Sequence, residues 1–333
     1  MPSPSATSRP AASSAPSWPR RRRLALQLAG VAIVSVALAF WARGLDLRRL
    51  AAALASAAPG GLVAAALIAF ACIAWKAAFW RFALAPVAPV SFAPLLRYSL
   101  AATVGSILAP ARAGDAFRVW ILRRRHEVPL SVSLTVVGLE KLGDVGALLL
   151  LASPLPWLSP RLPAPARSWV FALAALPVVA VVAIGVVRRH PRWSRMPAFA
   201  GLALFEHPRS VGRALSCVGM GWLFDLGAIA LVLHAVGAAP TLGRALTVLL
   251  FVNLAIAVPL TPGNAGTHEL GSALALKLEG VDAETATAFA LLYHGLQTIP
   301  VLLVGFVDGR ALLASARDAS ARAEASPREQ ISR

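Results

Sequence analysis

The chain alternates between long apolar runs and short connections that carry most of its arginines. A helix needs about 20 mainly apolar residues to cross the roughly 30 Å hydrocarbon core of a bilayer. Six runs approach or exceed that length, at positions 24–41, 60–82, 131–152, 168–187, 211–236 and 285–306. The pattern therefore predicts an all-α, polytopic transmembrane helical bundle with about six full spans.

Two further apolar stretches, 94–110 and 243–278, are interrupted by proline, glycine and charged residues. Irregular backbone at membrane depth is tolerated only where protein covers it or where it lines a cavity. We therefore expect two re-entrant or broken helical hairpins in addition to the full spans. The expected breaks are at Pro110, Gly114, Pro262, Gly263 and Gly266.

Composition supports a membrane protein. Of the 333 residues, 58% are hydrophobic and 14% are charged, whereas soluble domains have about 25% charged residues. We expect an uncleaved first helix, although basic residues before a short apolar run are also typical of a cleaved signal peptide. The predicted division of the chain is a disordered cytoplasmic tail at 1–19, a membrane domain at 20–310 with halves at 20–152 and 168–308, and a cytoplasmic tail at 311–333.

The formal charge of +17 comes from arginine clusters beside the apolar runs. Because the chain has no nucleic-acid-binding motif, no nucleic-acid partner is expected. If the N-terminus is cytoplasmic and 94–110 returns to the side from which it enters, 23 of the 32 Lys and Arg residues are cytoplasmic and 6 lie outside. This asymmetry follows the positive-inside rule. It predicts a multi-pass protein of the cytoplasmic membrane with both termini in the cytoplasm.

With this topology, each half has two spans, a re-entrant element and a last span, and the halves have opposite orientations. That is the plan of inverted-repeat transporters. The segments 110–115 and 262–269 add weak support, because each has a proline, a glycine four residues later, and then an acid. We therefore expect an inverted repeat.

The first group of candidate residues is Arg112, Asp115 and Arg118, beside the first break. Free backbone N–H groups at a broken helix, together with guanidinium groups, suit the binding of a phosphate. Asp115 is expected near the start of the next helix, where an acid is favourable. The same pattern is typical of a topogenic loop followed by a capped helix, so both interpretations stay open.

The second group is Glu140 and Asp144, which lie one turn apart in the run 131–152 and so share a helix face. Ionisable groups at membrane depth usually face the bundle interior or a wet cavity, and they are candidates for function. Lys141 points elsewhere and is free to pair with another helix. Asp225, a single acid in an apolar run, is a further candidate. The alternative for the group is a structural ion pair between helices.

The third group is Glu269, after the second break, with Tyr293 and His294 in the last run. A buried histidine with no function is the alternative for His294. His268 and Glu269 do not complete a zinc-protease pattern, because Ser272 stands where the second histidine is needed. No metal and no cofactor are expected.

Three segments, taken in order, resemble a known family. They are Pro110-Ala-Arg-Ala-Gly-Asp-Ala-Phe-Arg118, Glu140-Lys-Leu-Gly-Asp144 and Pro262-Gly-Asn-Ala-Gly-Thr-His-Glu269. The resemblance is to the membrane region of lysylphosphatidylglycerol synthases and their stand-alone, flippase-like relatives, over most of 24–310. The family pattern has arginine where this chain has Lys141 and His294. The positions of this chain that match the family pattern are Arg112, Gly114, Asp115, Arg118, Glu140, Asp144, Gly263, Gly266, Glu269 and Tyr293.

The resemblance implies that the chain moves a lipid or lipid-linked head group across the bilayer. About 25 residues follow the last run, too few for the aminoacyl-transferase domain of the synthases, so we expect a transporter and no enzyme. The expected partners are membrane lipids with anionic or zwitterionic head groups, with a homo-oligomer or a lipid-synthesis enzyme left open. The alternatives are a membrane-embedded transferase or hydrolase using Asp115 or Glu140 as general base, and a non-catalytic subunit of a lipid-synthesis complex.

Overall fold

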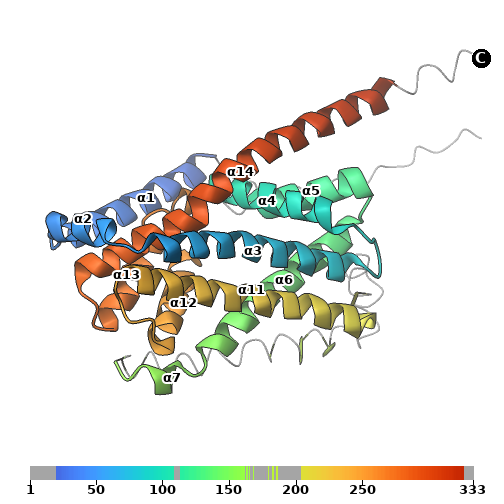
Figure 1. The fold of residues 1–333 in the computed structure, drawn as a ribbon. Coiled ribbons are helices and arrows are strands. Elements are labelled where there is room, and N and C mark those ends of the chain that lie inside the picture. The colour runs from blue at the N-terminus through green and yellow to red at the C-terminus, as the bar shows by residue number, and fades with distance from the viewer. Residues whose placement is uncertain are drawn as a thin grey trace, which may run out of the picture.

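A computed structural model describes residues 20–108, 113–161 and 204–325, with isolated positions between 163 and 186. Every regular element in these ranges is helical (Figure 1). The predicted tail 1–19 and most of the predicted span 168–187 lie outside the described residues. So do Pro110 and Arg112.

The described helices are, in chain order, α1 (Arg20–Ala42), α2 (Leu47–Ala55), α3 (Pro59–Leu84), α4 (Phe92–Leu108), α5 (Ala113–His126), α6 (Leu130–Ala152), α7 (Leu155–Leu158), α11 (Pro208–Ala235), α12 (Leu242–Ile256), the short 3₁₀ helix η2 (Pro262–Asn264), α13 (Thr267–Leu278) and α14 (Ala283–Ala325). They form a helical membrane bundle, as the sequence predicts.

Among the described residues, three helices are long and apolar enough to span a membrane: α3, α11 and the part of α14 at Ala283–Gly305. A fourth span results if α1 from Leu28 and α2 are counted together, although the pair is bent by 94°. The 23-residue helix α6 is also long enough, but three charged residues interrupt its apolar sequence. The fold class is thus confirmed, whereas the predicted number of six spans stays a prediction.

The interrupted stretch 243–278 forms both arms of a helical hairpin, whereas 94–110 forms only one arm, α4, and the return arm α5 lies beyond it. Helix α4 packs on α5, and α12 packs on α13. Figure 1 shows that α4 starts at the end of the bundle where α3 finishes, and that α12 starts at the opposite end, where α11 finishes. The tips meet inside the bundle, because η2 contacts α4. The two hairpins therefore penetrate the bundle from opposite ends, as expected for re-entrant elements.

Glycines fix the geometry of both hairpins. A Cβ atom at Gly114 would overlap the carbonyl oxygen of Ala102, so α5 crosses α4 at a distance that only glycine permits. In the second hairpin, Gly263 and Gly266 have φ of 60° and 86°, in the left-handed region. These values explain why the chain leaves the helical conformation between α12 and α13.

The helix contacts are alike in the two halves. Helices α3 and α11 pack on each other, and Figure 1 shows them antiparallel. Each of them also packs on the hairpin of its own half and on both α6 and α14. Across the halves, α14 packs on α4, and α6 packs on α12. Two related halves in opposite orientations would produce this arrangement, so it supports the predicted inverted repeat without proving it.

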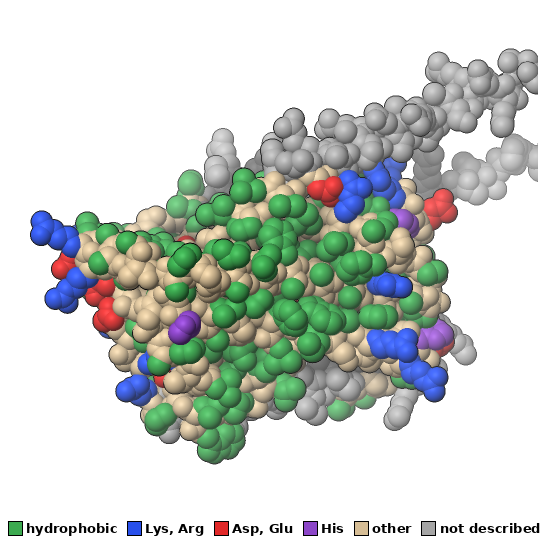
Figure 2. All heavy atoms as spheres, in the orientation of Figure 1, with side chains coloured by type: hydrophobic (Ala, Val, Ile, Leu, Met, Phe, Trp, Pro, Cys, Tyr) green, Lys and Arg blue, Asp and Glu red, His purple; other side chains and the backbone are tan. Residues whose placement is uncertain are grey.

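The surface is that of an integral membrane protein. Figure 2 shows hydrophobic side chains along the middle of the bundle, with Lys and Arg side chains gathered toward its two ends. Many large apolar side chains of the described residues are exposed, among them Leu67 at 65%, Leu150 at 75% and Leu303 at 67%. A surface of this kind suits contact with lipid hydrocarbon.

Candidate functional site

A cavity of about 390 Å³ lies where the two hairpin tips approach each other. Helices α3, α6, α11 and α14, which come from both halves, supply most of its wall. The tips contribute Thr103 and Ile107 on one side and Gly263 and Asn264 on the other. Most of the lining is apolar, but the cavity also meets ten ionisable or amide side chains: Cys72, Lys76, Glu140, Asp144, Cys217, Asp225, Asn264, His268, His294 and Gln297.

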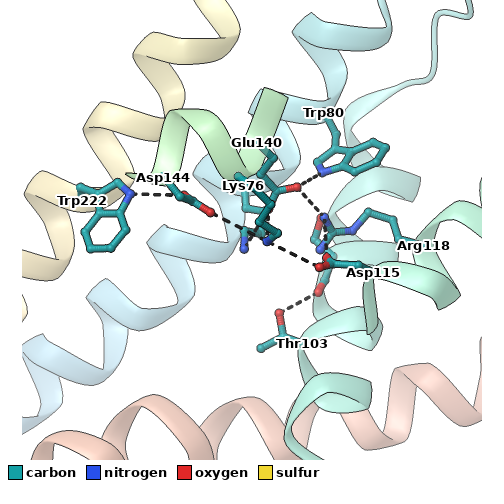
Figure 3. Close-up of polar contacts among 10 residues, drawn as sticks. Lys76, Trp80, Thr103, Asp115, Arg118, Glu140, Asp144 and Trp222 are labelled. Carbon is teal, nitrogen blue, oxygen red and sulfur yellow. Dashed lines mark hydrogen bonds and ion pairs between the residues drawn. The ribbon is translucent and has the colours of Figure 1, made fainter. Parts of the chain in front are cut away.

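Glu140 is the centre of the first polar network (Figure 3). Its side chain is only 2% exposed. The Trp80 indole N–H donates to its Oε2 over 2.7 Å, and Arg118 Nη1 donates to the same oxygen over 3.0 Å. Lys76 Nζ lies 3.0 Å from Oε1. A carboxylate can stay ionised in such a buried place because two cations and an indole surround it.

Arg118 is as enclosed as Glu140, with 3% of its side chain exposed. Its guanidinium carbon lies 5.0 Å from the centre of the Trp80 ring, a cation–π contact. Asp115, one turn earlier in α5, lies 4.0 Å away. The predicted position of Asp115 is confirmed, since it lies in the first turn of α5. Arg118 therefore links the first hairpin to α6 and α3.

Lys141 and Asp144 complete this network. Lys141 Nζ lies 3.5 Å from Asp115 of α5, so it does pair with another helix, but it also lies 3.8 Å from Glu140 and 3.9 Å from Asp144. The expectation that Lys141 points away from these two acids is therefore wrong. The Trp222 indole N–H donates to Asp144 Oδ1 over 3.2 Å. The network thus balances three cations, Lys76, Arg118 and Lys141, with three anions, Asp115, Glu140 and Asp144.

The second polar network has fewer charges. Asp225 Oδ1 accepts hydrogen bonds from the Tyr293 hydroxyl over 2.7 Å and from the Gln297 amide over 2.8 Å. Tyr293 is 2% exposed, so its hydroxyl depends on this bond. No Lys or Arg pairs with Asp225 in the described part of the chain. Two neutral donors from α14 therefore satisfy this acid.

The break between α12 and α13 is held by a histidine and an acid. Glu269 Oε2 accepts the backbone N–H of Gly266 over 2.6 Å, and its Oε1 lies 2.7 Å from His294 Nδ1. His294 Nε2 lies 3.1 Å from the carbonyl oxygen of Gly263. The His268 ring stacks on the His294 ring with their centres 4.3 Å apart. His294 of α14 thus contacts both sides of the break.

The structure brings the predicted residues together to different degrees. Glu140, Asp144 and His294 line the cavity. Asp115 and Arg118 do not line the cavity. Arg118 pairs with Glu140, and Asp115 pairs with Lys141. Tyr293 reaches the cavity through Asp225. Glu269 lines a separate cavity of about 190 Å³ on the far side of the break.

The site also contains four residues that the sequence does not predict as site residues: Lys76, Trp80, Trp222 and Gln297. Lys76 could have been found, because a lysine within the span 60–82 satisfies the same rule that selected Glu140. Indole and amide side chains give no comparable signal, because that rule concerns ionisable groups. In the described part of the chain, no three His, Cys, Asp or Glu side chains are grouped so that they could hold a metal ion.

Comparison with known families decides the relationship. The family model described as the lysylphosphatidylglycerol synthase TM region matches residues 27–305. The chain belongs to this family. The match contains both hairpins and both polar networks, and it confirms the resemblance found in the sequence. No curated protein matches the chain.

Membership of this family makes the chain an integral membrane protein related to lipid modification or lipid flipping. The family relationship therefore also indicates an interaction with membrane lipids.

Proposed function

We propose that this protein moves a lipid head group across the cytoplasmic membrane through the cavity between the hairpin tips. The observation that carries the proposal is the cavity itself, which has apolar walls and charged groups from both halves. A polar head group inside the hydrocarbon region needs such partners, because an unpaired polar group there is costly. The acyl chains would stay in the lipid outside the bundle.

The exposure of the charged groups supports different roles for them. The side chains of Lys76 and Asp144 are 34% and 29% exposed, whereas those of Glu140 and Arg118 are 2% and 3% exposed. Lys76 and Asp144 therefore offer the head group a cation and an anion. This pair suits an anionic or zwitterionic head group. Glu140 and Arg118 act as positioning residues, because they hold Lys76 and the first hairpin.

The proposed orientation places the open end of the α4–α5 hairpin in the cytoplasm, together with both termini. Arg81, Arg97 and the 123–125 cluster lie at or near this end, in agreement with the positive-inside rule. Arg112, which precedes α5 in the sequence, stays a predicted phosphate ligand. A head group from the cytoplasmic leaflet would then reach the cavity past the first hairpin. The α12–α13 hairpin would face the opposite side.

We propose a transporter and not an enzyme. A transferase or hydrolase acting on a lipid phosphate, and a non-catalytic subunit of a lipid-synthesis complex, are the alternatives from the sequence. Each of these predicts that lipid stays in its leaflet when the purified protein acts alone. A transport measurement therefore separates them from the proposal.

The test is leaflet-resolved lipid transport in proteoliposomes, with labelled lipids that differ only in the head group. Asp144→Asn removes the exposed anion but keeps an acceptor for Trp222, and Lys76→Met removes the exposed cation. We expect each variant to slow the transport of one lipid class about tenfold or more, since a hydrogen bond to a charged group contributes about 1.5–3 kcal/mol. Glu206→Gln, at an exposed position before α11, is the matched control.

Folding of each variant is checked by gel filtration in detergent. Wild-type protein that is folded but transports no lipid class would contradict the proposal. Equal transport by wild-type protein and both cavity variants would also contradict it, because the charges in the cavity would then have no role.

A further inference from the structure

His294 has a hydrogen-bond acceptor at each of its two ring nitrogens. Nε2 lies 3.1 Å from the carbonyl oxygen of Gly263, and a carbonyl oxygen can only accept. Nδ1 lies 2.7 Å from Oε1 of Glu269. The other carboxylate oxygen of Glu269 already accepts the Gly266 N–H over 2.6 Å. The imidazole is thus held between two acceptors.

A neutral imidazole has one N–H and one lone pair, whereas an imidazolium has two N–H groups. If His294 were neutral and Glu269 ionised, one ring nitrogen would direct a lone pair at an oxygen lone pair. Both contacts are attractive only if the pair holds one more proton. That proton lies on the ring, or on Glu269, which then donates to Nδ1. In either case the two residues together bind it.

We propose that His294 and Glu269 form a proton-binding site that fastens the tip of the α12–α13 hairpin to α14. The site sits on the break, where Gly263 and Gly266 have positive φ. With the proton bound, α14 holds Gly263, and Glu269 holds Gly266. When the proton leaves for water in the cavity, one of the two contacts of His294 becomes repulsive. The tip then loses its link to α14.

Other titratable groups surround this site. His268 of α13 stacks on His294. Asp225 of α11 lies nearby, bound to Tyr293 and Gln297 on the same helix as His294. Across the same cavity lie Cys72 and Lys76 of α3 and Glu140 and Asp144 of α6, while the residues of α4 that line it, Thr103 and Ile107, do not titrate in the relevant range. Of these groups, Glu269 is the acid in direct contact with His294.

The site also connects to transport. Because His294 lines the cavity, a moving tip would change the wall of the cavity. We infer that the proton is the coupling ion for head-group movement, and this part rests on the proposed function. The proton site and its effect on the tip do not depend on the proposed function.

The experiment measures the accessibility of the tip as a function of pH. Ala265→Cys places a thiol at an exposed position of the break, in a chain whose own cysteines are removed by Cys72→Ser and Cys217→Ser. The rate of labelling by a water-soluble maleimide is followed from about pH 5 to pH 9, a range that includes histidine titration. Because thiol chemistry itself depends on pH, every rate is divided by that of a reference variant.

The reference adds His294→Arg, which keeps a cation that donates at all pH values of the scan. A second variant, Glu269→Gln, lets an amide N–H donate to Nδ1 of a neutral imidazole, so no extra proton is needed. We expect the corrected rate to rise severalfold with pH when His294 and Glu269 are both present, and to stay flat with Glu269→Gln. His234→Gln, at an exposed position of α11, should leave the rise unchanged.

A flat profile with both residues present would overturn the proton site. A rise that persists with Glu269→Gln would overturn it too, because another group would then control the tip. A proton-dependent tip in a protein that transports no lipid would leave the site standing and contradict only the proposed function.

Discussion

The α4–α5 and α12–α13 hairpins both bring polar groups to the same cavity, but different interactions anchor them. The first is joined to α3 and α6 by ion pairs of Arg118, Glu140 and Lys76. The second is joined to α14 through His294 and Glu269, whose contacts depend on a proton. Under the proposal above, loss of the proton therefore releases the second hairpin from α14, while the first hairpin keeps its ion pairs.

The contrast is clearest in the partners of one acid from each half, the buried Glu140 and the half-buried Asp225. Glu140 is surrounded by cations, whereas Asp225 is surrounded by the neutral donors Tyr293 and Gln297. Removing an acid from among cations leaves unpaired buried charge, while removing a neutral donor leaves an acid with fewer partners. Substitution of Glu140 should therefore lower the stability more than substitution of a donor to Asp225.

The largest loss of stability is expected for Glu140→Ala. This change leaves Lys76 and Arg118 without their shared carboxylate, and breaking a buried ion pair in this way costs about 3–5 kcal/mol. The loss can be measured as a fall in Tm and in resistance to denaturant in detergent. Glu206→Ala, at an exposed position, should have almost no effect. An equal effect of the two changes would show that Glu140 is not the centre of the network.

A smaller loss is expected for Gly114→Ala in the first hairpin. The added methyl group meets the carbonyl oxygen of Ala102, which forces α4 and α5 apart. Overpacking of this kind costs about 1–3 kcal/mol. The control is Gly138→Ala on α6, where the new atom meets open space, and where alanine should stabilise the helix slightly. If both substitutions gave the same Tm, the close crossing would be wrong.

A loss of about 1–2 kcal/mol is expected for Tyr293→Phe, because Asp225 loses one donor but keeps Gln297. Equilibrium unfolding in detergent measures it.

A second prediction concerns the pair Tyr293→Phe and Gln297→Leu: together they should cost more than the sum of the single changes, since Asp225 is then left without a donor. Purely additive losses would contradict the bonding described for this acid.

The smallest effect is expected for Arg97→Ala. The guanidinium of Arg97 donates to Asp308 over 2.8 Å, which joins α4 to α14, but its side chain is 49% exposed. An exposed ion pair contributes about 0–1 kcal/mol. The fall in Tm should shrink further when salt is raised. A large loss at high salt would mean that this contact holds the first hairpin in place.

Much of the fold could be predicted from the sequence because apolar length and the position of Pro and Gly are local signals. The runs 60–82, 211–236 and 285–306 correspond to helices that are long and apolar enough to span a membrane, and each interrupted stretch forms at least one arm of a hairpin. The span count stays open for two physical reasons. Glu140, Lys141 and Asp144 make α6 more polar than an ordinary span, and the first run bends by 94° into α2.

The site was predicted only in part. The rule that charge at membrane depth indicates function selected Glu140 and Asp144, and applied consistently it would also have selected Lys76. The sequence could not show that Arg118 is enclosed by Trp80, because that contact depends on how α5 packs against α3. Nor could it show that the backbone of Gly263 is a partner of His294. Contacts between distant segments decide both.

The most direct test of the central claim is to fill the cavity and measure lipid transport. Ala69→Trp places the largest side chain in the lining of the cavity, while Leu67→Trp places it two residues away on the 65% exposed, lipid-facing side of the same helix. In the leaflet-resolved assay, we predict that Ala69→Trp abolishes transport and that Leu67→Trp retains it, with both proteins folded. Undiminished transport by Ala69→Trp would show that the head group does not pass through this cavity.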